Sequence, residues 1–239
     1  MKWIPIFLFF ASVPACLLIP VRLVFERLLS RYWPLALASA LWGLRDAYLV
    51  VAWFRGNYPA AWHGIYDNKG VGAGFFLLDI ALTLGCFHQL ARRSRDMYPW
   101  GFGLIGVFVA VATGGALATS TPGTGLFSSA YLLVRYSHAF CGAFLLLTLF
   151  FFSAGFSSSA VASAAAFDQA VIAVTYFTGT FMANTLSSKD GIPERVIGSN
   201  LVGLVCLGCF TAWTLLITQN RDASSSEASL KTRAAGAGG

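Results

Sequence analysis

Seven long apolar stretches, separated by short polar segments, constrain this chain more than any other feature of its sequence. They cover residues 3–25, 34–54, 71–91, 100–120, 127–153, 162–184 and 196–218. A membrane-spanning helix needs about 20 mostly apolar residues to cross about 30 Å of hydrocarbon, and each stretch reaches that length. The sequence therefore predicts an all-α fold: one membrane bundle of seven transmembrane helices over residues 1–218. A disordered cytoplasmic tail, rich in Ser, Ala and Gly, is expected over residues 219–239.

The composition agrees with a membrane protein and excludes an ordinary globular enzyme. Hydrophobic residues make up 57% of the chain and charged residues only 11%, whereas soluble domains usually carry about 25% charged residues. The formal net charge of +6 does not indicate a nucleic-acid partner, because the basic residues fall in the predicted loops rather than along one helical stripe. We therefore expect the lipid bilayer as partner, no nucleic acid and no enzymatic activity.

Basic residues also predict the orientation in the membrane. They gather in the loops after the first and third stretches and in the tail: Arg27, Arg31, Arg92, Arg93, Arg95, Arg221, Lys231 and Arg233. Because Lys and Arg stay on the cytoplasmic side, we expect the N-terminus outside and the C-terminus inside, in a bacterial inner membrane. Val13-Pro14-Ala15-Cys16 resembles a lipoprotein cleavage box, but residues 17–25 stay apolar, so we expect the first stretch to be retained.

Six ionisable residues fall inside the predicted spans away from their ends, where an unpaired charge is costly. They are Arg45, Asp46, Asp79, Arg135, His138 and Asp168. An unpaired buried charge is strongly destabilising, so we expect these residues to pair. Arg45 and Asp46 are neighbours in sequence, and neighbours on a helix point about 100° apart. We therefore expect different partners for them: Asp79 for Arg45, and Arg135 for Asp46.

Two main interpretations of these six residues stay open, beside a third in which they face water at a thinned or irregular span. In one, they line a polar cavity and bind a small solute, an ion or a proton. In the other, they are interhelical bridges that fix the packing. The carboxylates among them outnumber the arginines, so one carboxylate must be protonated, hydrated or matched by His138. Such a surplus carboxylate is suited to bind a proton or a cation.

An internal repeat is predicted by sliding the chain along itself by 123 residues. The second and third stretches then fall on the sixth and seventh without a gap: Ala47 meets Ala170, and Leu84-Gly85-Cys86-Phe87 meets Leu207-Gly208-Cys209-Phe210. This predicts two parallel triplets of helices joined by the fourth stretch, which is a design used by transporters. The alternative is that apolar helices share such residues by chance.

The sequence indicates no cofactor and no metal. A retinal Schiff base needs a lysine in the last span, which has none. A bis-histidine haem needs two histidines at one depth, whereas His88 and His138 are expected at different depths. No His-Glu-x-x-His spacing occurs. All five cysteines lie in predicted spans, where thiols act as small apolar side chains.

Three local patterns resemble a group of seven-span membrane proteins of soil bacteria. They are Arg31-Tyr32-Trp33-Pro34 at the start of the second stretch, the aromatic segment 62–66, and His88-Gln89-Leu90-Ala91-Arg92 before Tyr98-Pro99. The resemblance covers the first half of the chain and implies the seven-span fold. That group has no assigned activity, so no functional residue is carried over. The two-triplet layout also looks like that of small sugar and vitamin-precursor transporters.

The function predicted first is therefore that of a small-solute transporter or facilitator whose site is formed by the six ionisable residues. The alternative is a membrane sensor, or an interaction subunit of a larger complex. In that case the same residues are structural, and a membrane partner protein carries the signal onward.

Overall fold

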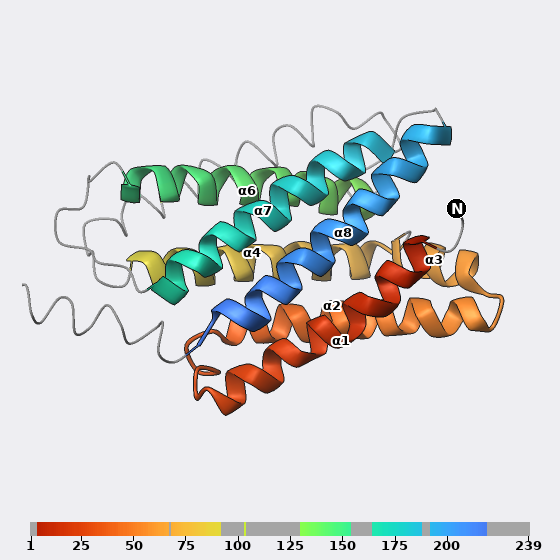
Figure 1. Cartoon of the computed structure of the whole chain (residues 1–239). Helices are drawn as coiled ribbons and strands as arrows, with labels where there is room; N and C mark the ends of the chain where they lie inside the picture. The colour runs from red at the N-terminus through yellow and green to blue at the C-terminus, as the bar shows by residue number, and fades with distance from the viewer. Residues whose placement is uncertain are drawn as a thin grey trace, which may run out of the picture.

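A computed structural model of the chain describes residues 4–66, 68–91, 103, 130–153, 164–187 and 192–218. These residues form helices and no strand, which confirms the predicted all-helical class. The helices are α1 (Ile4–Phe25), α2 (Trp33–Phe54), α3 (Tyr58–Tyr66), α4 (Lys69–Ala91), α6 (Ala130–Ser153), α7 (Ala164–Ser187) and α8 (Ile192–Leu216), as Figure 1 shows. The predicted span at 100–120 lies outside the described residues except for Gly103, and so does the predicted tail.

The six long helices coincide with six of the predicted apolar stretches, whereas the short helix α3 falls in a segment that the sequence predicts to be a loop. Pro59 fits the first turn of this helix, where its missing N–H group leaves no bond unmade. The aromatic rings then hold α3 against the end of α2: the ring centroids of Trp53 and Tyr58 are 5.5 Å apart, and those of Tyr58 and Trp62 are 5.9 Å apart.

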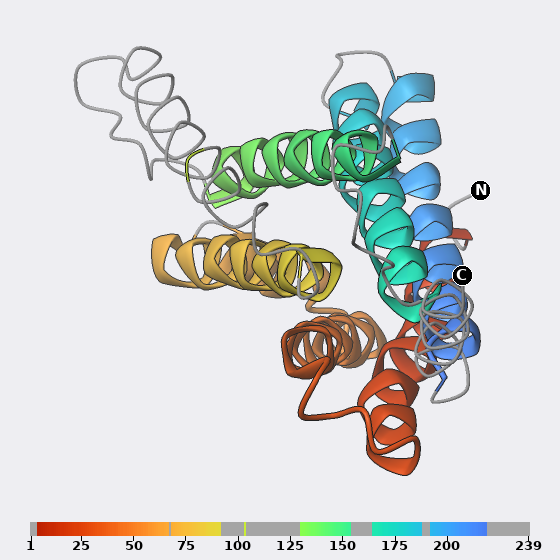
Figure 2. The ribbon, with the colours of Figure 1, turned by 90° about the vertical axis from the view of Figure 1, so that its left-hand side faces the viewer.

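The six long helices form two layers of three. One layer holds α2, α4 and α6, and the other holds α1, α8 and α7, as the end-on view in Figure 2 shows. Contacts between neighbours close a ring in the order α1, α2, α4, α6, α7, α8 and back to α1. In addition, α4 contacts α7 across the middle of this ring. The centre of the bundle is therefore reached by side chains from both layers.

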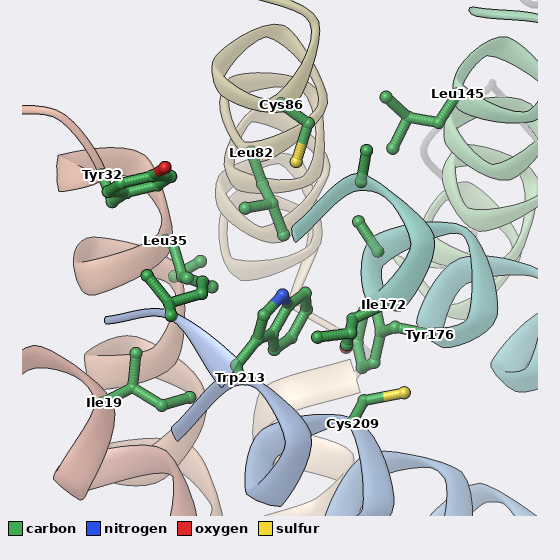
Figure 3. Close-up of a cluster of buried hydrophobic side chains, with 14 of the residues drawn as sticks. Ile19, Tyr32, Leu35, Leu82, Cys86, Leu145, Ile172, Tyr176, Cys209 and Trp213 are labelled. Atoms are coloured by element: carbon green, nitrogen blue, oxygen red, sulfur yellow. The ribbon is translucent and has the colours of Figure 1, made fainter. Parts of the chain in front are cut away.

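Aromatic side chains fill much of this centre. The ring centroid of Trp42 lies 4.8 Å from that of Tyr176, 5.6 Å from that of Phe210 and 6.4 Å from that of Trp213. Figure 3 shows Trp213 and Tyr176 among the surrounding aliphatic side chains of both layers. Aromatic pairs at these distances stabilise a core beyond the area that they bury, so this cluster ties α2, α7 and α8 together.

Glycines allow close approach at five contacts of the ring. Gly43 lies against α1, Gly85 against α2, Gly142 against α7, Gly179 against α8, and Gly203 against α1. At each of them an added Cβ would come within 2.9 Å or less of a neighbouring side chain. Small residues at helix contacts are typical of membrane bundles, because they let backbones pack closely. The remaining contact of the ring, between α4 and α6, carries a cluster of polar side chains.

The helices α1 and α2 end in the same hydrogen-bonded motif. In α1 the N–H group of Leu28 bonds to the carbonyl of Leu23, and in α2 that of Asn57 bonds to the carbonyl of Ala52. The motif needs a left-handed residue just after the helix. Gly56 supplies it after α2 with a φ of 70°, whereas Arg27 supplies it after α1 with a φ of 56°.

Replacing Arg27 with glycine is therefore expected to stabilise the protein. A side chain in the left-handed region costs about 1 kcal/mol relative to glycine, so the free energy of unfolding should rise by about that amount. Arg55→Gly is the matched control: it also removes an arginine next to a helix end, but from an ordinary φ of −84°, so it should give no gain. Denaturant titration in detergent micelles compares the two, and an equal change in both would contradict the assignment of strain to Arg27.

Two of the described helices are long and apolar enough to cross a membrane by length and composition: Trp33–Phe54 and Gly70–Ala91. Shorter apolar stretches, Phe10–Phe25, Ser137–Phe151 and Asn200–Leu216, lie within α1, α6 and α8. A buried helix of a soluble protein can meet the same criteria. The seven-span prediction therefore goes beyond what these helices establish.

Candidate functional site

Polar side chains from five helices, all buried except the partly exposed Arg45, lie at nearly the same height in the bundle. They sit between about two and three helical turns from the end that holds the start of α1 and the end of α2. We call this set the polar layer; it consists of Ser12, Arg45, Asp46, Asp79, Ser137, His138 and Thr180. The alternating directions of the helices bring these residues together although they are far apart in sequence.

One half of the polar layer is a chain of contacts across α4, α6 and α7. The Oδ2 atom of Asp79 lies 3.3 Å from Nε2 of His138, and it accepts a hydrogen bond of 2.7 Å from the Ser137 hydroxyl. On the other side of the imidazole ring, Nδ1 lies 2.9 Å from the hydroxyl oxygen of Thr180. Asp79 is 1% exposed and His138 is 6% exposed, so the chain is shielded from solvent.

The other half of the polar layer joins α1 and α2. Asp46, which is 1% exposed, accepts a hydrogen bond of 2.7 Å from the Ser12 hydroxyl at Oδ2. Its Oδ1 atom accepts from Arg45, with 2.8 Å to Nε and 2.7 Å to Nη2. The guanidinium carbon of Arg45 also lies 5.6 Å from the ring centroid of Phe75 in α4, which is within the range of a cation–π contact.

Tyr176 lies between the two halves. Its ring centroid is 5.5 Å from that of His138 and 4.8 Å from that of Trp42. The charges of both Asp79 and Arg45 act on its hydroxyl group. Tyr176 therefore lies near both pairs, although no direct bond joins them among the described contacts.

The predicted pairing of Arg45 with Asp79 is wrong. Arg45 bonds to its own neighbour Asp46, because its long, flexible side chain curls back across the angle that separates neighbours on a helix. The carboxylate of Asp79 is matched by His138 instead, which is one of the three ways that the sequence left open. The side chain of Arg135 lies outside the described residues, so its pairing with Asp46 stays a prediction.

Asp168 is not brought into the polar layer. It lies near the start of α7, about 18 Å along the helix from Thr180 at 1.5 Å per residue. The structure therefore brings Arg45, Asp46, Asp79 and His138 to one height and leaves Asp168 toward the opposite end of the bundle.

The hydroxyl groups of the polar layer were not predicted from the sequence. Ser12, Ser137 and Thr180 each bond to one of the charged or titratable side chains. Hydroxyls are common in buried helices because they can bond to the backbone of the preceding turn, as Thr148 does. Their residue type alone therefore carries no functional signal, and only their height relative to Asp46, Asp79 and His138 could have pointed to them.

Within the described part of the chain, no group of three or more His, Cys, Asp or Glu side chains is placed to hold a metal ion. Comparisons with family models, with curated proteins and with solved structures find no match to this chain. The resemblance noted in the sequence therefore stays a prediction, and the case for a function depends on the polar layer itself.

Proposed function

We propose that this chain is a seven-span protein of a bacterial inner membrane that transports a small polar solute through its bundle. The lengths of the helices support the membrane part of this proposal. The six long helices have 22 to 25 residues each, which correspond to about 33–38 Å at 1.5 Å per residue. That is enough to cross about 30 Å of hydrocarbon, and the apolar stretch at 100–120 would supply the seventh span.

The outer surface of the bundle also supports a lipid environment. Large apolar side chains are exposed on all six long helices, including Phe25 at 82%, Phe54 at 74% and Met182 at 70%. Soluble monomers seldom expose continuous apolar surface on this scale. A bilayer would cover these side chains on every lateral face, whereas a partner protein would cover one side.

The order of helices in the ring supports the predicted repeat. Helices α1, α2 and α4 follow one another around the ring, and α6, α7 and α8 follow in the same way. The two halves meet at three contacts, α4 with α6, α4 with α7, and α8 with α1. This is the arrangement expected of two parallel triplets related by an axis along the membrane normal, where a substrate site lies between the halves near mid-depth.

The observation that carries the proposal is the buried ionisable pair between the two halves. Asp79 comes from the first triplet, and His138 and Thr180 come from the second. The Oδ1 atom of Asp79 is buried and has no hydrogen-bond partner among the described residues. A buried carboxylate oxygen that is left unsatisfied is costly, and ionisable groups inside a membrane mark solute or proton pathways. The polar layer is therefore the place where a polar solute would be held.

The second candidate is a sensor or interaction subunit, and one observation favours it. In both ionisable pairs the carboxylate is buried and also accepts a hydrogen bond from a serine hydroxyl, as in structural bridges. Under this alternative the pairs fix the packing, no solute crosses, and a partner protein binds the bundle.

Uptake into proteoliposomes distinguishes the two candidates. The purified protein is tested with a panel of radiolabelled sugars, amino acids and small organic acids. At least one solute should enter faster than into empty liposomes, and Asp79→Asn should reduce that uptake at least tenfold. Thr148→Val is the matched control, because it also removes a buried hydrogen-bonding group but lies outside the polar layer. No uptake of any solute by the folded protein, together with copurification of a stoichiometric partner, would favour the sensor.

A further inference from the structure

We propose that Asp79 and His138 together bind one proton and that this proton is the coupling ion of transport. The coupling part rests on the proposed function, whereas the proton site itself rests on the hydrogen bonds around the imidazole ring. The site has three members that can carry a movable hydrogen: the Asp79 carboxyl group, the His138 ring and the Thr180 hydroxyl.

The Thr180 hydroxyl has one hydrogen to donate. Its oxygen lies 2.6 Å from the carbonyl oxygen of Tyr176 and 2.9 Å from Nδ1 of His138. The carbonyl can only accept, and it is the nearer of the two, so the hydroxyl donates to the carbonyl. Thr180 must then accept its second bond, and His138 must donate it from an Nδ1–H group.

The hydrogen on Nδ1 determines which state of Nε2 faces the carboxyl group of Asp79. A neutral imidazole with its hydrogen on Nδ1 has a bare lone pair on Nε2. That lone pair would point at Oδ2 of Asp79 at 3.3 Å, where a bare carboxylate would repel it. One further proton is needed between the two atoms, carried either by Nε2 or by Oδ2. The pair therefore holds one proton more than a neutral imidazole beside a carboxylate, and it is uncharged as a whole.

No other described group replaces this proton. Cys141 on α6 and Tyr176 on α7 are titratable side chains near Asp79, and both are uncharged at neutral pH. Arg45 acts on the same tyrosine from the other half of the polar layer, but its guanidinium is bonded to Asp46. The Ser137 hydroxyl donates to Oδ2 without adding a charge.

Loss of the proton would act on the contact between the two triplets. With the proton bound, Asp79 of α4 and His138 of α6 attract each other. Without it, a carboxylate faces an imidazole lone pair in a site shielded from water, and the contact becomes repulsive. Release of the proton thus favours separation of α4 from α6, and binding favours closure. This is what coupling of a solute pathway to a proton requires.

Nitrogen NMR of the full-length protein in detergent micelles tests the proton site. The chain contains three histidines, His63, His88 and His138, so ¹⁵N-histidine labelling gives few signals, and His138→Gln assigns the one of interest. We expect Nδ1 of His138 to carry a hydrogen throughout, and Nε2 to change with pH together with the carboxyl signal of Asp79. Thr180→Val should abolish the preference for hydrogen on Nδ1, whereas Thr148→Val should leave it unchanged. A neutral ring with its hydrogen on Nε2 at neutral pH would overturn the proposal.

The proteoliposome assay, repeated with an inward proton gradient, tests the coupling. Any solute that enters should enter at least fivefold faster with the gradient, and Asp79→Asn should remove this acceleration. Solute uptake that ignores the gradient, with the hydrogen of His138 on Nε2, would overturn the proton site and leave transport standing. The expected NMR result without uptake of any solute would keep the proton site and remove the transport function.

Discussion

Replacing His138 with leucine is expected to lower the free energy of unfolding by about 3–5 kcal/mol, the cost of breaking a buried ion pair by removing one partner. The carboxylate of Asp79 would stay buried at 1% exposure but would lose its ionisable partner. The measurement is unfolding by denaturant in detergent micelles at neutral pH.

A double variant distinguishes the cost of the unpaired carboxylate from the cost of poorer packing around the new leucine. In His138→Leu with Asp79→Asn no charge is left, and Asn can still bond to the Ser137 hydroxyl that now bonds to Asp79. Removing both charges of a buried pair is often close to neutral, so the double variant should recover at least about 2 kcal/mol of the loss. A double variant that is no more stable than His138→Leu alone would mean that leucine destabilises the protein because it packs poorly, and not because it leaves Asp79 unpaired.

Gly142→Ala is also expected to destabilise the protein strongly, because it fills the tightest of the glycine contacts. A Cβ on Gly142 would lie 2.7 Å from Cγ2 of Thr178 and 3.3 Å from the backbone nitrogen of the same residue. The methyl group of Thr178 can shift, but its backbone cannot do so without moving α7. Overpacking of this kind costs about 1–3 kcal/mol, and the free energy of unfolding should fall by about 2 kcal/mol.

Gly208→Ala provides the matched control for this change. It is also a glycine inside a long helix, but an added Cβ would meet nothing within 4 Å. Alanine is preferred over glycine in helices by about 1 kcal/mol, so this variant should be slightly more stable than the natural chain. If both variants shift stability in the same direction, the close packing of α6 on α7 is not what Gly142 provides.

The positions of the long helices could be predicted from the sequence because each of them is a continuous apolar stretch. This signal does not depend on where the neighbouring helices lie. The short helix α3 could not be predicted in the same way, because nine residues are too few to form a stable helix without tertiary contacts. The ring of Tyr58, which contacts both Trp53 of α2 and Trp62, supplies such a contact.

The candidate site could be predicted in part, for a related reason. The high cost of buried charge singles out Asp46, Asp79 and His138 from sequence alone, and the structure places all three in the polar layer. Partner choice depends on the rotation of each helix and on side-chain reach, which sequence spacing does not define. That is why the sequence pairs Arg45 with Asp79, although Arg45 bonds to the adjacent Asp46.

The elbow between α2 and α3 has a consequence for detecting motion. Only residues 55–57 separate the two helices, and ring contacts of Tyr58 with Trp53 and Trp62 join them at this junction. We therefore expect the indole of Trp62 to move together with the C-terminal end of α2. Since α2 also carries Asp46, Trp62, as one of the seven tryptophans in the chain, would contribute a change in fluorescence to rearrangements that begin at the buried charges.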